Sequence, residues 1–279
     1  MDSPGRTLRR RKLSKTLRRY RREAGLSMRE LAKRTRLQTS TISRIESGEH
    51  TIMPRNVQLI LQACGVGAPE MDTLVRIAEG AEDVSWWVTY SDTVPDWFRD
   101  FVDLETDAEV IRTYASELVD GLLQTKRYAT AVAEAGRLGS MTEEELQRAV
   151  ELREARQARL DTLQLHVVMN EAVVRRTFGD QDVMREQFER LADLSERDNL
   201  TIQVLPFAAG GHPAAKGPFT LMRFPEGFDD MDLVYVETEN GGIWQERASD
   251  IDRYNRIFTR VTELALSPEE TRSLLISLI

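Results

Sequence analysis

The sequence has one cysteine and no long apolar run, and each scarcity excludes a class of protein. Because Cys64 is the single cysteine, the chain can form no intrachain disulfide, which argues against a disulfide-rich secreted domain. No apolar stretch is long enough to span a bilayer, and the basic N-terminus lacks the apolar segment of a secretory signal. We therefore expect a cytoplasmic protein in which Cys64 is a small buried core residue.

Sequence motifs of common catalytic sites are also missing. The chain has no H-E-x-x-H metalloprotease motif, no G-x-S-x-G nucleophile elbow, no Walker loop and no dinucleotide-binding glycine pattern. Its three histidines, His50, His166 and His212, are too scattered to suggest a metal site. The sequence therefore predicts no catalytic residue, no cofactor and no metal site, and we expect a protein that is not an enzyme.

Charges of opposite sign are concentrated in two regions of the chain. Residues 1–60 hold 16 Lys and Arg against 5 Asp and Glu, whereas the whole chain holds 38 against 46. The remaining 219 residues therefore carry 22 basic against 41 acidic side chains. A basic head is suited to a polyanion such as DNA, and an acidic body is repelled by it. The acidic body could attract a basic partner, although a solvated acidic surface is the commoner explanation.

Residues 26–54 have the pattern of two short amphipathic helices joined by a tight turn. Ser27 followed by Glu30 predicts a capping box at the start of the first helix. The turn is expected near residues 35–37, and the second helix should run from residue 38 or 39 to residue 47. This is the pattern of a DNA-reading helix-turn-helix, although helical hairpins of this kind also occur in all-α domains that bind no DNA. The basic charge of the head favours DNA binding.

Two sets of residues are candidates for contacts with DNA. Residues that face outward from the second helix are short or forked hydrogen-bonding side chains, which suit base edges: Thr39, Ser40, Ser43 and Arg44. The candidates for phosphate contacts are Arg18, Arg22, Ser27, Lys33 and Arg36. The arginines of the first predicted helix could form only a solvated face, but their number and single sign favour phosphate contacts.

The arrangement L-S-x-x-x-L-A-x-x-x-x-L-x-x-x-x-I-S-R-I-E-x-G, which begins at Leu26, resembles the phage-repressor-like (XRE-type) family of helix-turn-helix regulators. The resemblance implies a structural ion pair between Arg21 on the preceding helix and Glu46 at the end of the second helix. In that family a glutamine that clamps a phosphate usually stands at the position of Met28. The second helix usually begins with Ser or Thr; here Gln38 occupies that position, which leaves the following threonine as an alternative cap.

Changes in the apolar period predict the division of the chain. An all-α head of five helices is expected over residues 7–80, a linker that contains Trp86 and Trp87 over residues 81–94, and an α+β domain over residues 95–279. The predicted strands of this domain lie within residues 109–119, 163–170, 200–207, 218–224 and 231–238. Its predicted helices lie within residues 95–105, 125–136, 142–160, 181–197, 248–265 and 268–278. We expect one mixed sheet of about five strands.

Several runs of the body occur in a characteristic order: VDGLLQTKRYATAV, RQARL, LHVVMNEAVVRRTFGD, TIQVLPFAAGGHPAAKGPFTLMRF, LVYVET and ALSPEET. Behind such a head, these runs are similar to the antitoxin-like transcriptional regulators of actinobacteria, the WhiJ type. The resemblance implies a transcription regulator that is often encoded beside a small protein that binds it. Asp120 departs from that family, which usually has Pro before Gly-Leu-Leu-Gln-Thr.

One loop of the body is a candidate for ligand or partner binding. Residues 208–219 connect two predicted strands and bring His212 and Lys216 together with three glycines. The alternative is a flexible connection whose glycines only permit the turn. His166 lies on a predicted core strand, where we expect a structural role.

The expected partners follow from both parts of the chain. They are double-stranded DNA, a second copy in a homodimer, and a small protein encoded by a neighbouring gene. The alternative to a protein partner is a small molecule sensed by the body.

Overall fold

The computed structural model describes residues 7–48, 52–79, 89–90, 96–136, 142–225, 228–238 and 241–279. Its contacts divide the chain into two compact units, Met1–Thr89 with Arg99–Leu104, and Tyr90–Phe98 with Glu105–Ile279. Trp86, Trp87 and His50 lie outside the described residues, so the expectations for them stay predictions. The predicted domain boundaries and linker stay predictions.

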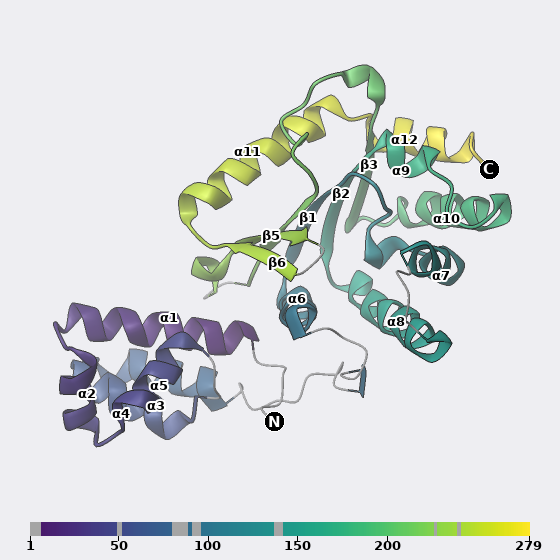
Figure 1. Ribbon diagram of the computed structural model, residues 1–279. Helices are drawn as coiled ribbons and strands as arrows, with labels where there is room; N and C mark the ends of the chain where they lie inside the picture. The colour runs from purple at the N-terminus through teal and green to yellow at the C-terminus, as the bar shows by residue number, and fades with distance from the viewer. Residues whose placement is uncertain are drawn as a thin grey trace. The chain divides into compact units, whose positions relative to one another are not determined.

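Besides the segment Arg99–Leu104, which belongs to a sixth helix, the described residues of the first unit form five α-helices, as the sequence predicts (Figure 1). They are α1 (Thr7–Glu23), α2 (Met28–Thr35), α3 (Thr39–Ser47), α4 (Pro54–Cys64) and α5 (Ala68–Glu79). Local residues start and end them: Ser27 and Glu30 form a complete capping box at α2, and Pro54 occupies the first turn of α4. Gly48 ends α3 with a φ of 75°, a left-handed conformation that favours glycine.

Apolar side chains from the described helices form one core in this unit. Its large members without exposed surface are Leu13, Leu17, Leu31, Ile42, Val57 and Leu61. Each buried side chain of this size contributes about 1.5 to 3 kcal/mol through removal of apolar surface from water. Cys64 is only half-buried and packs against this core, so the expectation of a buried residue is right only in part.

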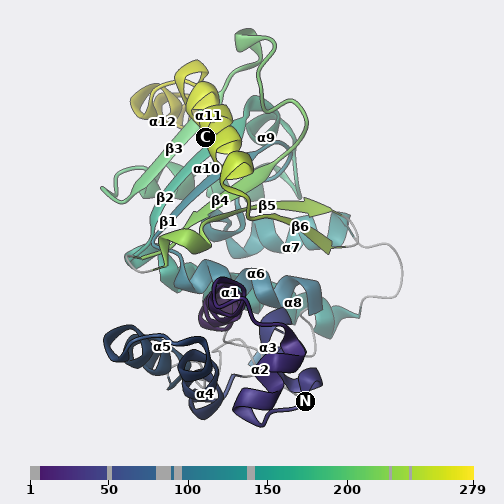
Figure 2. The ribbon, with the colours of Figure 1, turned by 90° about the vertical axis from the view of Figure 1, so that its left-hand side faces the viewer.

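The second unit is built on a mixed six-stranded sheet of order β3-β2-β1-β4-β5-β6 (Figures 1 and 2). The strands are β1 (Val110–Ala115), β2 (Gln164–Asn170), β3 (Leu200–Leu205), β4 (Phe219–Arg223), β5 (Leu233–Thr238) and β6 (Gly241–Gln245). β1, β2 and β3 are parallel to one another, whereas β4, β5 and β6 pair in antiparallel fashion. The predicted α+β domain with a mixed sheet is therefore confirmed.

The expected number of strands was one too few, because β6 was missed. Its sequence, GGIWQ, begins with two glycines and lacks the β-branched run that marks the other strands. Gly242 has a packing reason, since a Cβ there would lie 1.9 Å from the ring of Tyr235 on the neighbouring strand. Glycine at this position allows the Tyr235 ring to lie directly on the β6 backbone.

Helices cover both faces of the sheet (Figure 1). α11 (Ala248–Leu264) lies on one face and buries Phe258 and Val261 against it. The other face carries α7 (Lys126–Ala135), α8 (Glu143–Arg156) and α10 (Gln181–Leu194). The remaining helices are α6 (Asp96–Asp107), α9 (Glu171–Arg175) and α12 (Pro268–Ile276).

The helix predicted over residues 142–160 changes form before its end. α8 stops at Arg156, and a 3₁₀ turn, Gln157–Asp161, continues the chain. The side chain of Arg156 anchors this junction between α8 and the 3₁₀ turn. Its Nε and Nη2 donate to the two carboxylate oxygens of Glu105 at 2.7 and 2.6 Å. Asp120 begins the short 3₁₀ turn Gly121–Leu123 and accepts a hydrogen bond from the Leu122 N–H at 2.9 Å.

Candidate DNA-binding surface

α3 separates apolar from polar residues across its circumference. Ile42 and Ile45 are 0% and 3% exposed and face the core of the first unit. The four predicted base-contacting residues of α3 are all exposed: Thr39, Ser40, Ser43 and Arg44. The packing of α3 therefore leaves these side chains at the surface, where a helix that reads a major groove needs them.

The start of α3 differs from one expectation. Gln38 is the N-cap residue, without a capping hydrogen bond from its side chain, and Thr39 is already the first helical residue. The idea that Thr39 caps the helix is therefore wrong. Its side chain, like that of Ser40, is not used in capping α3.

A tight turn holds α2 and α3 together. Arg36 has a φ of 58°, the left-handed conformation, and is the one non-glycine residue of this kind in the described part of the chain. The Thr35 hydroxyl donates to the Leu31 carbonyl at 2.8 Å and accepts from the Leu37 N–H at 3.4 Å. Leu37 is half-buried against the core, so the turn is secured by packing as well as by hydrogen bonds.

A buried ion pair joins α1 to the end of α3. Arg21 Nε donates to Glu46 Oε1 at 2.6 Å, and its Nη2 donates to Oε2 at 2.7 Å. Arg21 Nη1 donates to the Leu26 carbonyl at 2.9 Å, which leads the chain into α2. The structure thus brings together the two residues that the family resemblance pairs. Bidentate geometry of this kind restrains the angle of α3 as well as its distance from α1.

A second buried contact secures the same end of α3. The Ser14 hydroxyl of α1 donates to the Ile45 carbonyl at 2.6 Å. Its Oγ also lies 3.4 Å from the position that a Cβ on Gly48 would occupy. α3 is therefore held at its C-terminal end by two polar contacts from α1.

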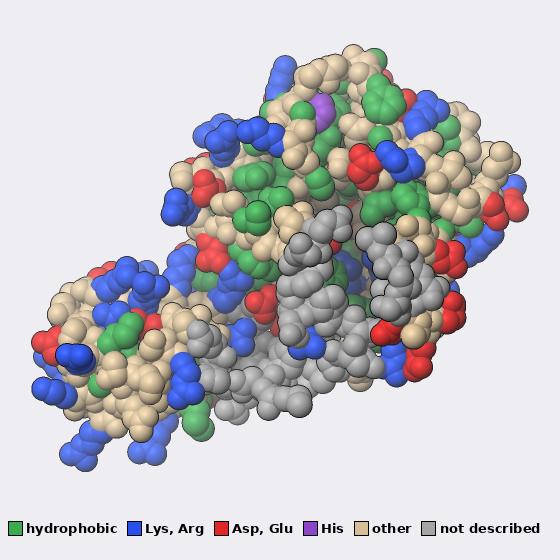
Figure 3. Space-filling view, in the orientation of Figure 1, with side chains coloured by type: hydrophobic (Ala, Val, Ile, Leu, Met, Phe, Trp, Pro, Cys, Tyr) green, Lys and Arg blue, Asp and Glu red, His purple; other side chains and the backbone are tan. Residues whose placement is uncertain are grey.

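The predicted phosphate-contacting residues are all exposed: Arg18, Arg22, Ser27, Lys33 and Arg36. Basic side chains, blue in Figure 3, are spread over the visible surface of the first unit. Arg29, in the first turn of α2, is also exposed. It was not among the predicted phosphate contacts, although it lies only two residues after Ser27, which was. Met28, at the position where phage-repressor-like regulators usually have glutamine, is half-buried and packs against the core.

Two family models match the chain. A model for a helix-turn-helix domain matches residues 12–74. A model for a domain of unknown function, DUF5753, matches residues 98–277, which is more than half of the chain. The chain belongs to the DUF5753 family. Comparison with curated proteins and with solved structures found no match. The helix-turn-helix domain makes this DUF5753 protein a DNA-binding regulator.

The predicted residues of the DUF5753 domain are placed in different surroundings. His166 Nε2 lies 2.7 Å from Gln203 Oε1, and its ring packs edge-on against Phe258. His166 is therefore a satisfied residue beneath α11, and burial lowers its pKa. His212 Nε2 lies 3.5 Å from the Tyr114 hydroxyl, whereas Lys216 is exposed. No hydrogen bond joins these two residues of the described loop.

No described helix combines the length and the apolar character that crossing a membrane requires. Within the same residues, no cluster of three or more His, Cys, Asp or Glu side chains is arranged to hold a metal ion.

Proposed function

We propose that this protein recognises a specific DNA sequence through α3 and thereby regulates transcription. The observation that carries the proposal is that α3 exposes its hydrogen-bonding side chains while a buried ion pair and an apolar core hold its other side. Arg44 reads a guanine, because its forked guanidinium can donate two hydrogen bonds to O6 and N7. Thr39, Ser40 and Ser43 contact neighbouring base edges or adjacent phosphates.

The basic residues outside α3 hold the DNA backbone in this proposal. Arg18 and Arg22 lie one turn apart on α1, and Lys33 and Arg36 lie on α2 and in the turn that follows it. The Ser27 hydroxyl and backbone N–H both donate to Glu30 Oε2, at 2.6 and 2.8 Å, so a contact to phosphate requires the hydroxyl to turn away from Glu30 and donate to the DNA instead. Contacts of this kind position the protein without reading sequence.

The protein acts as a homodimer in this proposal. One recognition helix reads only a few base pairs, and two copies about a two-fold axis multiply the specificity. Half-sites are then separated by about 34 Å, or a multiple of it, because successive major grooves face the same side of the duplex.

The DUF5753 domain is the regulatory part and is antitoxin-like, in that a small protein from a neighbouring gene controls it in the cytoplasm. The similarity of its sequence runs to the WhiJ-type regulators of actinobacteria supports this, and so does the acidic excess outside the head. A basic or dipolar partner would be attracted to such a surface. The domain has no catalytic role in this proposal.

The test is a binding titration on the protein's own promoter and on scrambled DNA. Arg44→Ala is expected to weaken operator binding by about 1 to 3 kcal/mol and to relax specificity at one position. Arg76→Ala is the matched control, because Arg76 is exposed on α5 and outside the proposed surface. Equal losses by Arg44→Ala on operator and scrambled DNA would contradict the base contact. Repeating the titration with the neighbouring gene's product tests control by a protein partner.

A small-molecule ligand is the second candidate for control. The DUF5753 domain contains a charged cleft of about 540 Å³, a volume in the range of small-molecule sites. Stabilisation of the domain by a ligand, measured without DNA, separates this candidate from control by a protein.

A further inference from the structure

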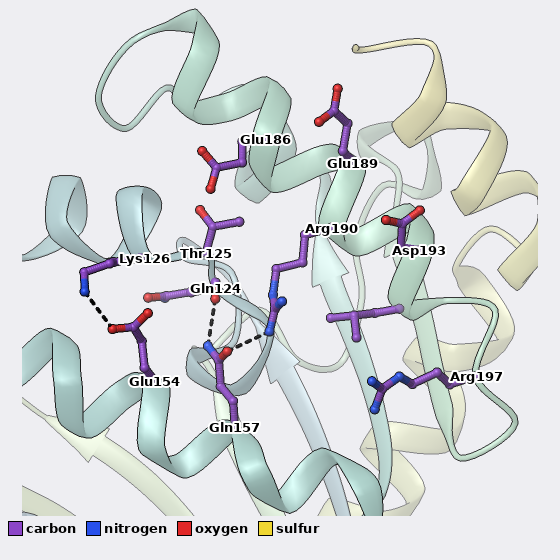
Figure 4. Close-up of a pocket in the computed structure, with 11 residues that line it drawn as sticks. Gln124, Thr125, Lys126, Glu154, Gln157, Glu186, Glu189, Arg190, Asp193 and Arg197 are labelled. Carbon is purple, nitrogen blue, oxygen red and sulfur yellow. Dashed lines mark hydrogen bonds and ion pairs between the residues drawn. The ribbon is translucent and has the colours of Figure 1, made fainter.

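The cleft in the DUF5753 domain lies between the start of α7, the end of α8 and the exposed side of α10 (Figure 4). Its floor is the segment that joins the 3₁₀ turn Gly121–Leu123 to α7. Gln157 Nε2 donates to the Gln124 carbonyl at 2.7 Å, and the Thr125 N–H donates to Gln187 Oε1 at 2.8 Å. The backbone of the floor is therefore held from both sides by side-chain amides, which makes it a fixed surface.

Arg190 extends from α10 across this cleft towards Gln157 (Figure 4). Its Nη2 donates to Gln157 Oε1 at 2.6 Å. Its Nε is buried and has no hydrogen-bond partner within the described residues. No carboxylate of the described part lies within ion-pairing distance of Arg190, unlike Arg156, which is matched by both oxygens of Glu105. Because the Nε is enclosed, the donors that Arg190 offers to the cleft are those of Nη1, which forms no hydrogen bond within the described residues.

No direct ion pair balances the positive charge of Arg190 within the described residues, although carboxylates line the same cleft. Burial lowers the pKa of its guanidinium, and the nearby charge of Arg197 lowers it further. An anionic group that enters the cleft would relieve both effects. Arginine is well suited to this role, because its planar guanidinium can hold a carboxylate through two parallel hydrogen bonds.

The other charges of the cleft limit what kind of anion can bind. Two of its acids already have basic partners: Glu154 lies 3.1 Å from Lys126, and Glu186 lies 3.3 Å from Arg127. Glu189 and Asp193, one turn apart on α10, are exposed and have no basic partner in the described chain. These carboxylates would repel a phosphate or another polyanion, and they would attract a cationic group.

We propose that this cleft binds a small amphoteric ligand of the amino-acid class, with its carboxylate on Arg190 and its ammonium group towards Glu189 and Asp193. The fixed floor and the unused donors of Arg190 supply the carboxylate site, and the two exposed acids supply the cation site. Such a ligand is the small molecule of the second candidate function. Binding is measured without DNA, so its failure is distinct from a failure of DNA recognition.

The experiment measures thermal stabilisation of the full chain by each of the common L-amino acids, followed by calorimetric titration of those that stabilise it. Acetate, methylammonium and inorganic phosphate are single-group probes at the same concentration. At least one amino acid is expected to raise the melting temperature, whereas the three single-group probes leave it unchanged.

Variants then assign the binding to Arg190. Arg190→Gln is expected to weaken the binding of the amino acid by about 10- to 100-fold, which is the usual loss of affinity when a charge-assisted hydrogen bond is removed. Arg185→Gln is the matched control on the same helix, since Arg185 is exposed and paired with Asp182 at 2.7 Å. It should leave the affinity unchanged.

A second variant keeps the test valid if Arg190→Gln fails to fold. Glu189→Gln with Asp193→Asn changes two exposed side chains and is expected to weaken the amino acid about 10-fold. The proposal is overturned if no amino acid stabilises the protein. It is also overturned if phosphate binds more tightly than every amino acid, or if the affinity is the same in the Arg190 and Arg185 variants.

Discussion

Each of the two units contains a buried arginine–glutamate pair that joins two helices, and the helices so joined differ in their exposure. In the first unit, Arg21 of α1 holds Glu46 at the end of α3, so the pair orients a helix whose other side is exposed. In the second unit, Arg156 of α8 holds Glu105 of α6, and Gly121 packs against the guanidinium. The same chemistry thus orients the helix proposed to read DNA in one unit and anchors a packed corner in the other.

A third arginine, Arg190, differs from the two arginines of these pairs. Arg190 is partly buried but lacks a carboxylate partner in the described chain, whereas Arg21 and Arg156 are each satisfied by one. Burial of a paired charge is structural, because the partner balances the charge inside the protein. A partly buried arginine without a carboxylate partner beside a cleft is a candidate ligand contact, and this is the basis of the proposed amino-acid site.

The largest effect is expected from breaking the pair in the second unit. Arg156→Met should destabilise this unit by about 3 to 5 kcal/mol, because Glu105 remains as a buried, unpaired charge. The variant also loses the contact of the guanidinium with the Phe98 ring, 5.3 Å from its centroid. Urea unfolding gives the loss, and hydrogen exchange of peptides locates it. The double variant Glu105→Leu/Arg156→Met should recover most of the stability; a double variant no better than the single one would contradict this explanation.

Breaking the pair in the first unit should cost slightly less. Arg21→Met leaves Glu46 unpaired and is expected to destabilise this unit by about 3 kcal/mol. Glu46→Gln keeps an acceptor for Arg21 and should lose only about 1 to 2 kcal/mol. Hydrogen exchange in both variants should increase in α1 to α5 and stay unchanged in the sheet. An increase in the sheet instead would show that the two units do not unfold separately.

Removal of a helix cap in each unit is expected to cause a smaller loss of stability. Ser27→Ala removes the cap of α2, and Ser267→Ala removes the cap of α12. Each is expected to cost about 1 kcal/mol, because an N–H at the helix start loses its acceptor. The losses should appear in opposite units by hydrogen exchange. Equal protection of both helices in the two variants would mean that neither hydroxyl stabilises its helix.

The smallest effect concerns pH and separates the two histidines of the second unit. Burial lowers the pKa of His166 below its ordinary value of 6.5, so the unfolded chain binds a proton there more readily than the folded one. Stability therefore falls as the pH drops from 6.5 towards the folded pKa, by at most about 1.4 kcal/mol per pH unit for one group. His166→Gln should flatten this part of the stability curve relative to the wild type. His212→Gln should retain it, and an identical slope in both variants would contradict the assignment.

Local sequence signals predicted the first unit well. Ser27, Glu30, Gly48 and Pro54 act on their immediate neighbours, so the starts and ends of α2, α3 and α4 could be read from short stretches. The exception is the start of α3, where Gln38 takes the cap position without a side-chain hydrogen bond. The Arg21–Glu46 pair was predicted from the resemblance to phage-repressor-like regulators, and the spacing of the two residues alone did not predict it.

The second unit was predicted in outline only. The apolar runs located five strands. β6 was not predicted, because the reason for its Gly242 is a contact with the ring of Tyr235 on the neighbouring strand, which appears only in the folded structure. The Arg156–Glu105 pair joins residues 51 positions apart, and the sequence offers no local sign of it. The loop of His212 and Lys216 was singled out for its residue types, whereas the cleft at Arg190 depends on helices that meet only in the fold.

The sequence by itself determined the separation of basic and acidic regions, the ends of many helices and the order of the main strands. These properties depend on composition, on period and on residues a few positions apart. Only the tertiary structure decided that Arg21 and Arg156 are balanced by carboxylates and that Arg190 faces a cleft. The physical reason is distance: charges interact strongly only when folding brings their atoms within a few ångströms, and their separation along the chain carries no information about that.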